Sequence, residues 1–174
     1  MSTIEIERKW LFDMESIPKT IPCIGEYLYE QAYLSTNPEV RIRKKQDLFN
    51  KSKVTTYVLC LKSKGSLSRI EVQKSVTKDE FEQLMEIGKL SSHDFIKKQP
   101  KRFVVDGHIL TVGISDLDRP TKFCYGEIEF ESELEANNFV PPDWFGKEVT
   151  DDQSYKMVNY WVRTRLKPQS PNCN

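Results

Sequence analysis

Acidic and basic side chains recur at two-residue spacing along several short segments of this sequence. Glu5, Glu7 and Lys9 form one such set near the start of the chain. Because residues two apart share one face of a β-strand, these three side chains would project together. Carboxylate oxygens favour hard divalent cations such as Mg²⁺ and Mn²⁺, whereas guanidinium and ammonium groups favour phosphate oxygens. The spacing therefore favours a site that handles a metal ion together with a phosphate compound.

Similar sets recur along the chain, and their charges are sorted by sign. The first and last strand-like segments carry carboxylates, whereas the middle segments carry mostly Arg and Lys. A metal-bound polyphosphate would satisfy both sets at once, which a free sugar or a peptide would not. The metal-ligand candidates are Glu5, Glu7, Glu71, Glu127 and Glu129. The phosphate-binding candidates are Arg41, Arg43, Lys62, Arg69, Lys98 and Arg102.

Two placements of these charged faces are open. They can be the solvent faces of an antiparallel sheet that covers an apolar core. Alternatively, they face one another across the inside of a barrel, while helices bury the apolar faces from outside. A closed ring of unpaired charge would cost on the order of several kcal/mol per ion, so the lumen must hold water or a ligand. The sorting by sign favours the barrel, because a solvated sheet does not need it.

Length, charge and cysteine content exclude several classes of protein. The 174 residues suit one domain, predicted over 1–166, with a disordered tail over 167–174. Lys+Arg and Asp+Glu are balanced at 26 each, and no apolar run reaches the roughly 18 residues of a membrane span, so neither nucleic-acid nor membrane binding is predicted. Two histidines argue against a zinc site or a Ser–His–Asp triad. Four cysteines without a C-x-x-C pair or a signal peptide favour free thiols in the cytoplasm. The chain is expected to be a monomer or a homodimer.

Short strand-like runs with turn residues between them predict an α+β fold based on an eight-stranded antiparallel barrel or sandwich, and the charged faces favour the barrel. Capping boxes at Thr77/Glu80 and Ser132/Glu135 predict helix starts, and residues 150–152 predict the start of a C-terminal helix. Such helices would pack outside the barrel and at its ends. The predicted strands are 3–12, 28–36, 39–46, 54–63, 67–76, 99–106, 108–116 and 122–132.

The E-x-E-x-K pattern of residues 5–9 resembles the start of the CYTH domain, or triphosphate tunnel metalloenzyme, family. One such motif is weak, but further matching motifs follow in order from residue 4 to about residue 161, and the ordered set is specific. The chain looks most similar to the short stand-alone bacterial members. The supporting motifs lie at 31–34, 40–43, 61–65, 67–71, 126–130 and 143–152.

The resemblance implies a tunnel open to solvent in which Mg²⁺ or Mn²⁺ supports chemistry on a triphosphate. For the stand-alone type it implies hydrolysis of inorganic tripolyphosphate to orthophosphate and pyrophosphate. Other members act on thiamine triphosphate, or cyclise ATP as class IV-type adenylyl cyclases. A non-catalytic module that binds polyphosphate or nucleotides is a third hypothesis.

Two residues are candidates for direct roles in catalysis. Lys9 shares the face of two glutamates and would orient or activate the attacking water, although a structural ion pair is the alternative. Tyr33, by analogy with the family, would contact the substrate or close the site. Lys156 would cap one tunnel mouth, whereas Trp144 and Trp161 are expected to pack in the core.

Four residues depart from the family pattern, which usually has acidic or basic side chains at or near these positions. The departures affect the second metal site and part of the phosphate clamp. They are Gln73, Pro100, Gly113 and Ser154.

Overall fold

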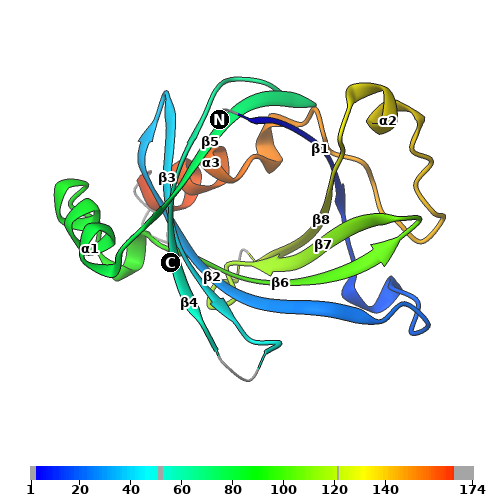
Figure 1. Cartoon of the computed structure of the whole chain (residues 1–174), viewed down its shortest axis with the longest axis horizontal. Coiled ribbons are helices and arrows are strands. Elements are labelled where there is room, and N and C mark those ends of the chain that lie inside the picture. The colour runs from blue at the N-terminus through cyan, green and yellow to red at the C-terminus, as the bar shows by residue number, and fades with distance from the viewer. Residues whose placement is uncertain (1–2, 51–52, 121, 167–174) are drawn as a thin grey trace, which may run out of the picture.

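Eight antiparallel strands close into a barrel, as Figure 1 shows. The computed structural model describes residues 3–50, 53–120 and 122–166. Around the barrel the strands follow the order β1-β5-β4-β3-β2-β6-β7-β8, and β8 pairs with β1. The strands are β1 (Thr3–Leu11), β2 (Cys23–Thr36), β3 (Glu39–Asp47), β4 (Thr55–Lys62), β5 (Ser68–Val76), β6 (Ile96–Val105), β7 (His108–Ser115) and β8 (Phe123–Glu129).

The predicted closed barrel is confirmed, and the boundaries of most strands agree within one or two residues. β2 begins at Cys23 instead of residue 28, and β6 begins at Ile96 instead of residue 99. The first residue of β2, Cys23, pairs with Phe103 near the end of β6. The first residue of β6, Ile96, pairs with Gln31 in the second half of β2. The long pairing between β2 and β6 therefore determines where both strands begin, which the alternation of residues within either strand alone does not predict.

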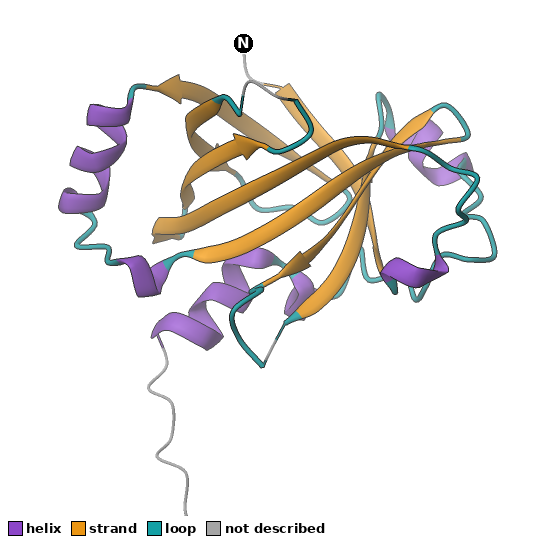
Figure 2. Cartoon of the chain, turned by 90° about the horizontal axis from the view of Figure 1, so that it is seen from below, coloured by secondary structure: helices purple, strands orange, loops and turns teal. Residues whose placement is uncertain are grey.

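Three α-helices lie outside the strands: α1 (Lys78–Ile87), α2 (Glu133–Asn138) and α3 (Met157–Trp161) (Figure 2). The capping box that begins α1 is confirmed, because Thr77 and Glu80 each accept a hydrogen bond from the backbone of the other. At α2 only half of the predicted box forms. Ser132 accepts from the Glu135 amide, but the Glu135 carboxylate turns to the amide of Glu131.

The C-terminal helix begins later than the sequence predicts. Asp152 caps a 3₁₀ turn at Gln153–Tyr155, and α3 starts only at Met157 and continues as a π-helical turn to Leu166. The prediction of a helix from residue 150 is wrong at this end. The Asp152 carboxylate accepts hydrogen bonds from the amide and hydroxyl of Ser154, which stabilises a local turn in place of a helical one.

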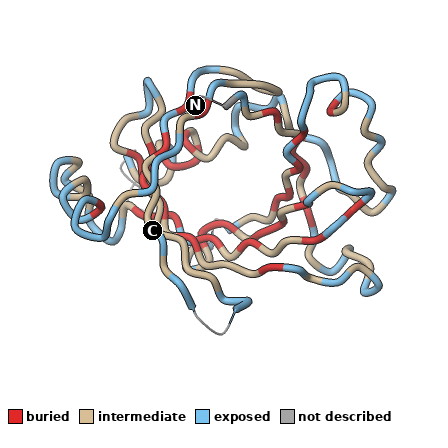
Figure 3. Tube along the Cα trace, in the orientation of Figure 1, coloured by how far each residue is buried: buried red, intermediate tan, exposed pale blue. Residues whose placement is uncertain are grey.

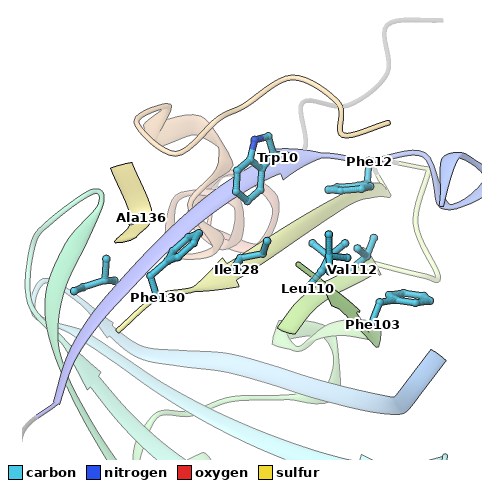
Figure 4. Close-up of a cluster of buried hydrophobic side chains, with 10 residues drawn as sticks. Trp10, Phe12, Phe103, Leu110, Val112, Ile128, Phe130 and Ala136 are labelled. Atoms are coloured by element: carbon cyan, nitrogen blue, oxygen red, sulfur yellow. The ribbon is translucent and has the colours of Figure 1, made fainter. Parts of the chain in front are cut away.

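Apolar residues on the outer faces of β1, β6, β7 and β8 form the largest core cluster, which Figure 4 shows in close-up. Trp10 and Phe12 pack edge-on against Phe145, and Trp144 packs against both Phe12 and Phe145. A second outer cluster lies between α1 and the strands, with Ile42 fully buried in it. Trp144 is thus a packing residue, as predicted.

One part of the barrel's outer face is not covered by a helix. Ile4 and Ile70 are cross-strand partners on β1 and β5, and they are 68% and 53% exposed. Leu61 on β4 is also exposed. The expectation that helices bury every apolar strand face is therefore wrong here. Three helices of 10, 6 and 5 residues are too short to cover eight strands.

Burial is concentrated in the strand walls (Figure 3), and it includes charged side chains. Lys9, Arg41, Lys62, Glu71 and Lys98 are all buried although they are ionisable. The predicted alternation is confirmed, since these residues face the lumen while their neighbours in sequence face out.

The three described cysteines, Cys23, Cys60 and Cys124, are free thiols. Cys173 and the predicted tail over 167–174 lie outside the described residues. In the part of the chain that the structure describes, no helix is long and apolar enough to cross a membrane.

Candidate active site

Charged side chains from six strands line a cavity inside the barrel, called the lumen cavity here. All the predicted site residues except Arg102 contribute to its wall. About 80 Å³ of it is free, roughly the space of a few water molecules. Its lining is Glu5, Glu7, Lys9, Tyr33, Glu39, Arg41, Arg43, Lys62, Arg69, Glu71, Gln73, Lys98, Tyr125, Glu127, Glu129, Lys156 and Met157.

Strand register brings the acidic motifs of the two chain ends together. β1 lies between β5 and β8, so Glu5 is opposite Arg69 and Glu7 is opposite Glu129. Lys9 is opposite Glu127 on the same strand pair. The E-x-E-x-K motif and the E-x-E of β8 thus form one continuous charged surface.

Part of this surface is already neutralised by ion pairs. Lys62 Nζ lies 2.6 Å from Glu5 Oε1 and 3.0 Å from Glu71 Oε2. Arg69 Nε lies 2.6 Å from Glu5 Oε2. Burial and the nearby Glu7 carboxylate nevertheless raise the pKa of Glu5 to about 7, whereas hydrogen bonds from Glu5 and Lys62 outweigh burial and lower the pKa of Glu71. This corner is a compact ionic network.

The carboxylates of β8 are less well compensated. Glu129 forms no ion pair with any described residue, and burial followed by repulsion from Glu127 and Glu7 raises its pKa. Among the described residues Glu127 forms one ion pair, with Lys9, whose Nζ lies 3.5 Å from its Oε2. Excess negative charge therefore collects along β8.

The cations of β3 and β6 that line the lumen cavity, Arg41, Arg43 and Lys98, form no ion pair with any described carboxylate. Arg41 is 6% exposed, and its Nε forms no hydrogen bond to the described residues. Arg43 donates to Gln31 Oε1 at 2.9 Å, and Lys98 donates to the hydroxyl of Tyr125. Burial, followed by repulsion from Arg43, Lys9 and Arg41, lowers the pKa of Lys98 to about 7. Excess positive charge thus lies in the same cavity as the carboxylates of β8.

Lys9 remains a cation in spite of its burial. Its Nζ lies 3.5 Å from Glu7 Oε1 and 4.9 Å from the centre of the Tyr125 ring. Burial lowers its pKa, but Glu7 and Glu127 outweigh burial and raise the pKa above the ordinary value. A lysine that holds its proton cannot serve as a general base, so its chemistry is electrostatic.

Tyr33 lies where the barrel meets its C-terminal plug. It is 2% exposed, and its ring centre lies 5.6 Å from that of Trp161 on α3. Burial raises the pKa of Tyr33, so the phenol is neutral at physiological pH. Val158, Tyr160 and Trp161 complete this apolar cluster, which confirms Trp161 as a packing residue.

Sequence reasoning missed Glu39 and Tyr125, both of which line the cavity. Each lies two residues before a predicted site residue on the same strand, Arg41 and Glu127, and this spacing is a signal that was available in the sequence. Lys156 was predicted to cap a tunnel mouth, and it lines the cavity while donating a hydrogen bond to the Gly65 carbonyl on the β4–β5 loop.

Arg102, predicted to bind phosphate with the other cations, does not line the lumen cavity. It lies four residues beyond Lys98 on β6, about 13 Å of strand. Its guanidinium stacks over the ring of Tyr27, 5.1 Å from the ring centre, at a more distant level of the barrel.

A larger hollow of about 640 Å³ lies outside the barrel beside α1. Its floor includes Phe81 and Phe95, and the charges on its rim are largely paired, as in Lys44–Glu30 at 2.7 Å. It does not combine excess positive and negative charge as the lumen cavity does. The smaller cavity is therefore the candidate site.

The comparisons with known proteins agree with this geometry. No family model matches the chain. An inorganic triphosphatase of Nitrosomonas europaea is 30% identical over 164 residues, which cover 87% of this chain and 93% of that protein. The chain belongs to the CYTH, or triphosphate tunnel, family. The crystal structure of the inorganic triphosphatase NE1496 matches with a TM-score of 0.58 and 27% identity, covering 93% of this chain and 96% of that chain.

A similar fold also occurs in a solved structure of lower sequence identity. A putative adenylate cyclase from Bacillus halodurans has a TM-score of 0.50 and 14% identity, and the match covers 78% of this chain and 85% of that chain. At this identity the likeness shows the fold alone.

Two of the departures from the CYTH pattern are a single structural feature. Pro100 and Gly113 are cross-strand partners on β6 and β7. A Cβ added at Gly113 would lie 2.7 Å from Pro100 Cα, so a side chain does not fit at that position next to this proline. Gln73 lines the cavity as a neutral residue, and Ser154 caps the turn before α3.

Proposed function

We propose that this chain hydrolyses a triphosphate, inorganic tripolyphosphate in the first place, to orthophosphate and pyrophosphate. The observation that carries the proposal is the separation of uncompensated charge inside one barrel. Among the described residues, Glu129 forms no ion pair with a cation, and Arg41 and Lys98 form none with a carboxylate. A phosphate chain with a bound cation supplies both missing partners. The similarity to an inorganic triphosphatase supports this assignment.

A divalent metal, Mg²⁺ or Mn²⁺, fits the donor chemistry of this site. Glu7, Glu127 and Glu129 present carboxylate oxygens, the ligands that both ions prefer. In the described residues no three His, Cys, Asp or Glu side chains are yet arranged as a metal cage. Repulsion from Glu127 and Glu7 helps to raise the pKa of Glu129, and a bound cation would relieve this repulsion. When bound, the metal would polarise a phosphoryl oxygen. Glu5 and Glu71, also predicted as ligands, are held by Lys62.

The residues of the chain supply binding and electrostatic stabilisation. Arg41, Arg43 and Lys98 would bind the phosphate oxygens and hold the chain in place. Water would attack the terminal phosphorus, the bond to the bridging oxygen would break, and the diphosphate would leave with the electron pair. The proton lost by water would pass to solvent or to a carboxylate. Protonated Lys9 would orient the water and stabilise the charge that develops on the phosphoryl group.

The plug formed by α3 would limit the access of bulk water from one end. Tyr33 contacts both the cavity and Trp161, so its neutral phenol could donate a hydrogen bond to a substrate oxygen. The three free thiols support a reducing cytoplasm as the expected location.

Glu129→Gln tests the proposal, with phosphate release from tripolyphosphate in Mg²⁺ or Mn²⁺ as the measurement. We expect a loss of at least about 10–100-fold, because disturbing the shells of a metal site has effects of this size. Glu131→Gln is the matched control, since Glu131 is exposed beyond the end of β8.

ATP and thiamine triphosphate are assayed beside tripolyphosphate. Formation of cyclic AMP from ATP would show that the protein catalyses cyclisation instead of hydrolysis. If Glu129→Gln keeps the wild-type rate, or if no triphosphate is turned over, the proposed function is wrong.

A further inference from the structure

Lumen-facing cations continue along the barrel beyond the lumen cavity. On β3, Arg41 and Arg43 are followed at the same spacing by Lys45, and Tyr29 on β2 is opposite Lys45. On β6, Arg102 follows Lys98 on the same face and is opposite Gly25. Lys45 and Arg102 are half-buried, so this end of the barrel reaches solvent. We call Lys45 and Arg102, with the rings of Tyr27 and Tyr29, the distal cation set.

The two rows are longer than a triphosphate needs. From Arg41 to Lys45, and from Lys98 to Arg102, each strand advances four residues, or about 13 Å. A triphosphate has only two P–O–P links, so its phosphate chain is shorter than this advance along the strand. A triphosphate held at the level of Arg41 and Lys98 would therefore leave donors unused at the level of Lys45 and Arg102.

The distal cations form no ion pair with any described residue, unlike their neighbours on the outer face, although the Asp47 carboxylate attracts Lys45 from a longer distance. Lys44 and Lys101, one residue away on the same strands, form ion pairs with Glu30 and Glu26 at 2.7 and 3.6 Å. In the described part of the chain Lys45 and Arg102 form neither ion pairs nor hydrogen bonds, and Arg102 Nε is buried without a partner. A buried donor without an acceptor is unusual in a folded protein.

Tyrosine rings hold these cations without using their N–H groups. Lys45 Nζ lies 4.1 Å and the Arg102 guanidinium 5.1 Å from the centre of the Tyr27 ring. The guanidinium of Arg43 lies 4.6 Å from the centre of the Tyr29 ring. Cation–π attraction offsets part of the charge, but the donors remain available to an anion.

These contacts also decide which ligand fits. A purine or pyrimidine base would have to stack on ring faces that cations already occupy. Phosphate oxygens would instead accept hydrogen bonds from the unused donors and would relieve the repulsion among Arg43, Lys45 and Arg102. The chemistry favours a chain that carries negative charge on every unit.

We propose that the distal cation set binds the phosphates beyond the third in longer linear inorganic polyphosphates. The proposal rests on the proposed function, because the end of the chain would occupy the lumen cavity while the rest extends toward the mouth opposite α3. A nucleoside in place of the extra phosphates would gain nothing from this set.

The double variant Lys45→Met/Arg102→Met tests the proposal in the full chain. Binding of size-fractionated linear polyphosphate, tens of phosphates long, is measured by calorimetry in EDTA, which does not depend on turnover. We expect the affinity for the long chain to fall at least about tenfold, a change of ~1.4 kcal/mol, and its salt dependence to become shallower. The affinity for tripolyphosphate should change much less.

Lys44→Met/Lys101→Met is the matched control. It also removes two positive charges from β3 and β6, but these charges lie on the outer face of the barrel. The control should therefore leave the affinity for the long chain near that of the wild type. An equal loss in both double variants would show a non-specific charge effect and would overturn the proposal. Equal losses for long chain and tripolyphosphate in the distal variant would do the same.

Failure of this proposal and failure of the proposed function have different signatures. If the wild-type protein hydrolyses tripolyphosphate but binds the long chain no more tightly than tripolyphosphate, the proposed function stands and the role of the distal cation set is refuted. A protein that binds the long chain through this set but releases no phosphate from any triphosphate supports the distal set and refutes the function.

Discussion

Lys98 is the lumen residue whose charge depends most on what the cavity contains. It is buried, its Nζ donates to Tyr125, and three other cations, Arg43, Lys9 and Arg41, repel it. Burial and this repulsion lower its pKa to about 7, so above that pH the free protein holds Lys98 mainly as a neutral amine. A phosphate anion in the cavity would favour the charged form and raise the pKa again.

We therefore expect tripolyphosphate binding at pH 8 to draw a proton onto Lys98. Well below pH 7 the residue is already charged, so this uptake should disappear. Calorimetry in EDTA, in two buffers of different ionisation enthalpy, measures the number of protons taken up. Lys98→Arg keeps the charge permanently and should remove this uptake. Identical proton uptake in wild type and Lys98→Arg at pH 8 would exclude Lys98 as the titrating group.

At the residue scale, alternation predicted the side chains that reach the lumen but not their depth along the barrel. Arg102 lies on the lumen face of β6, as predicted, but beyond the lumen cavity. Two-residue spacing predicts which face of a strand a residue occupies, but not how the strand is offset from its neighbours. The sequence also does not predict which acidic side chains form ion pairs with which basic ones. The contacts of Lys62 with both Glu5 and Glu71 depend on the closed strand order, with β1 beside β5.

The C-terminal segment is anchored to the barrel by a buried ionic contact. Asp116, just after β7, is 3% exposed and accepts hydrogen bonds from Arg165 and, at 2.6 Å, from Tyr160. Burial raises the pKa of Asp116, but the bonds from Arg165 and Tyr160 outweigh burial and lower it. Asp116 has a positive φ of 62°, a backbone conformation that Asn also adopts.

Asp116→Asn should remove the charge while keeping the backbone, and it leaves Arg165 buried without its counter-ion. We expect a loss of about 3–5 kcal/mol in the free energy of unfolding at neutral pH. Because the folded pKa lies below the ordinary 3.8, the contribution of Asp116 is present above about pH 4 and is lost as the pH falls through the folded value. Urea unfolding at pH 7 and pH 3 measures this difference, which should shrink at the lower pH.

Asp118→Asn is the control for this anchor. The Asp118 side chain is 65% exposed and pairs with Lys97 on the surface, so its loss should change stability by no more than about 1 kcal/mol. If both substitutions have the same small effect, Asp116 does not anchor the C-terminal segment.

Element boundaries were predictable where local chemistry decides them. Thr77 and Glu80 satisfy each other's amides, so the start of α1 can be read from four residues. The start of α3 depends on Asp152 and Ser154 preferring a local turn, which competes with the helix that the same residues also signal. The helix begins at Met157, where its apolar side chains meet Tyr33 and Ile96.

The whole molecule should be more stable when the lumen is occupied, because its uncompensated charges repel in the empty barrel. At tripolyphosphate concentrations about 100 times the Kd, linkage gives ~2.7 kcal/mol of stabilisation. For a protein of this size that corresponds to a rise in Tm of roughly 5–10 °C. Thermal unfolding in EDTA with and without tripolyphosphate measures it. Arg41→Met should reduce the rise, and an undiminished rise would place the ligand elsewhere.

The barrel itself was predictable because six strands repeat one pattern and the signs of their charges are sorted. The bare outer face over Ile4 and Ile70 was not, since alternation shows which residues face out but not which of them a helix will cover. The CYTH motifs reduced the number of possible topologies further, because they assign each strand-like segment to a position in the family's order along the sequence.

The closed strand order has a consequence for synthesis on the ribosome. β1 emerges first, yet its two partners are β5 and β8, and β8 begins only at Phe123. Residues Thr3–Ile6 can pair once β5 is made, but the edge of β1 over Glu7–Leu11 keeps exposed backbone donors and acceptors until β8 has been translated. The E-x-E-x-K segment is thus fully paired only after β8 is made, and a nascent chain stalled before β8 would carry an open edge able to recruit other strands.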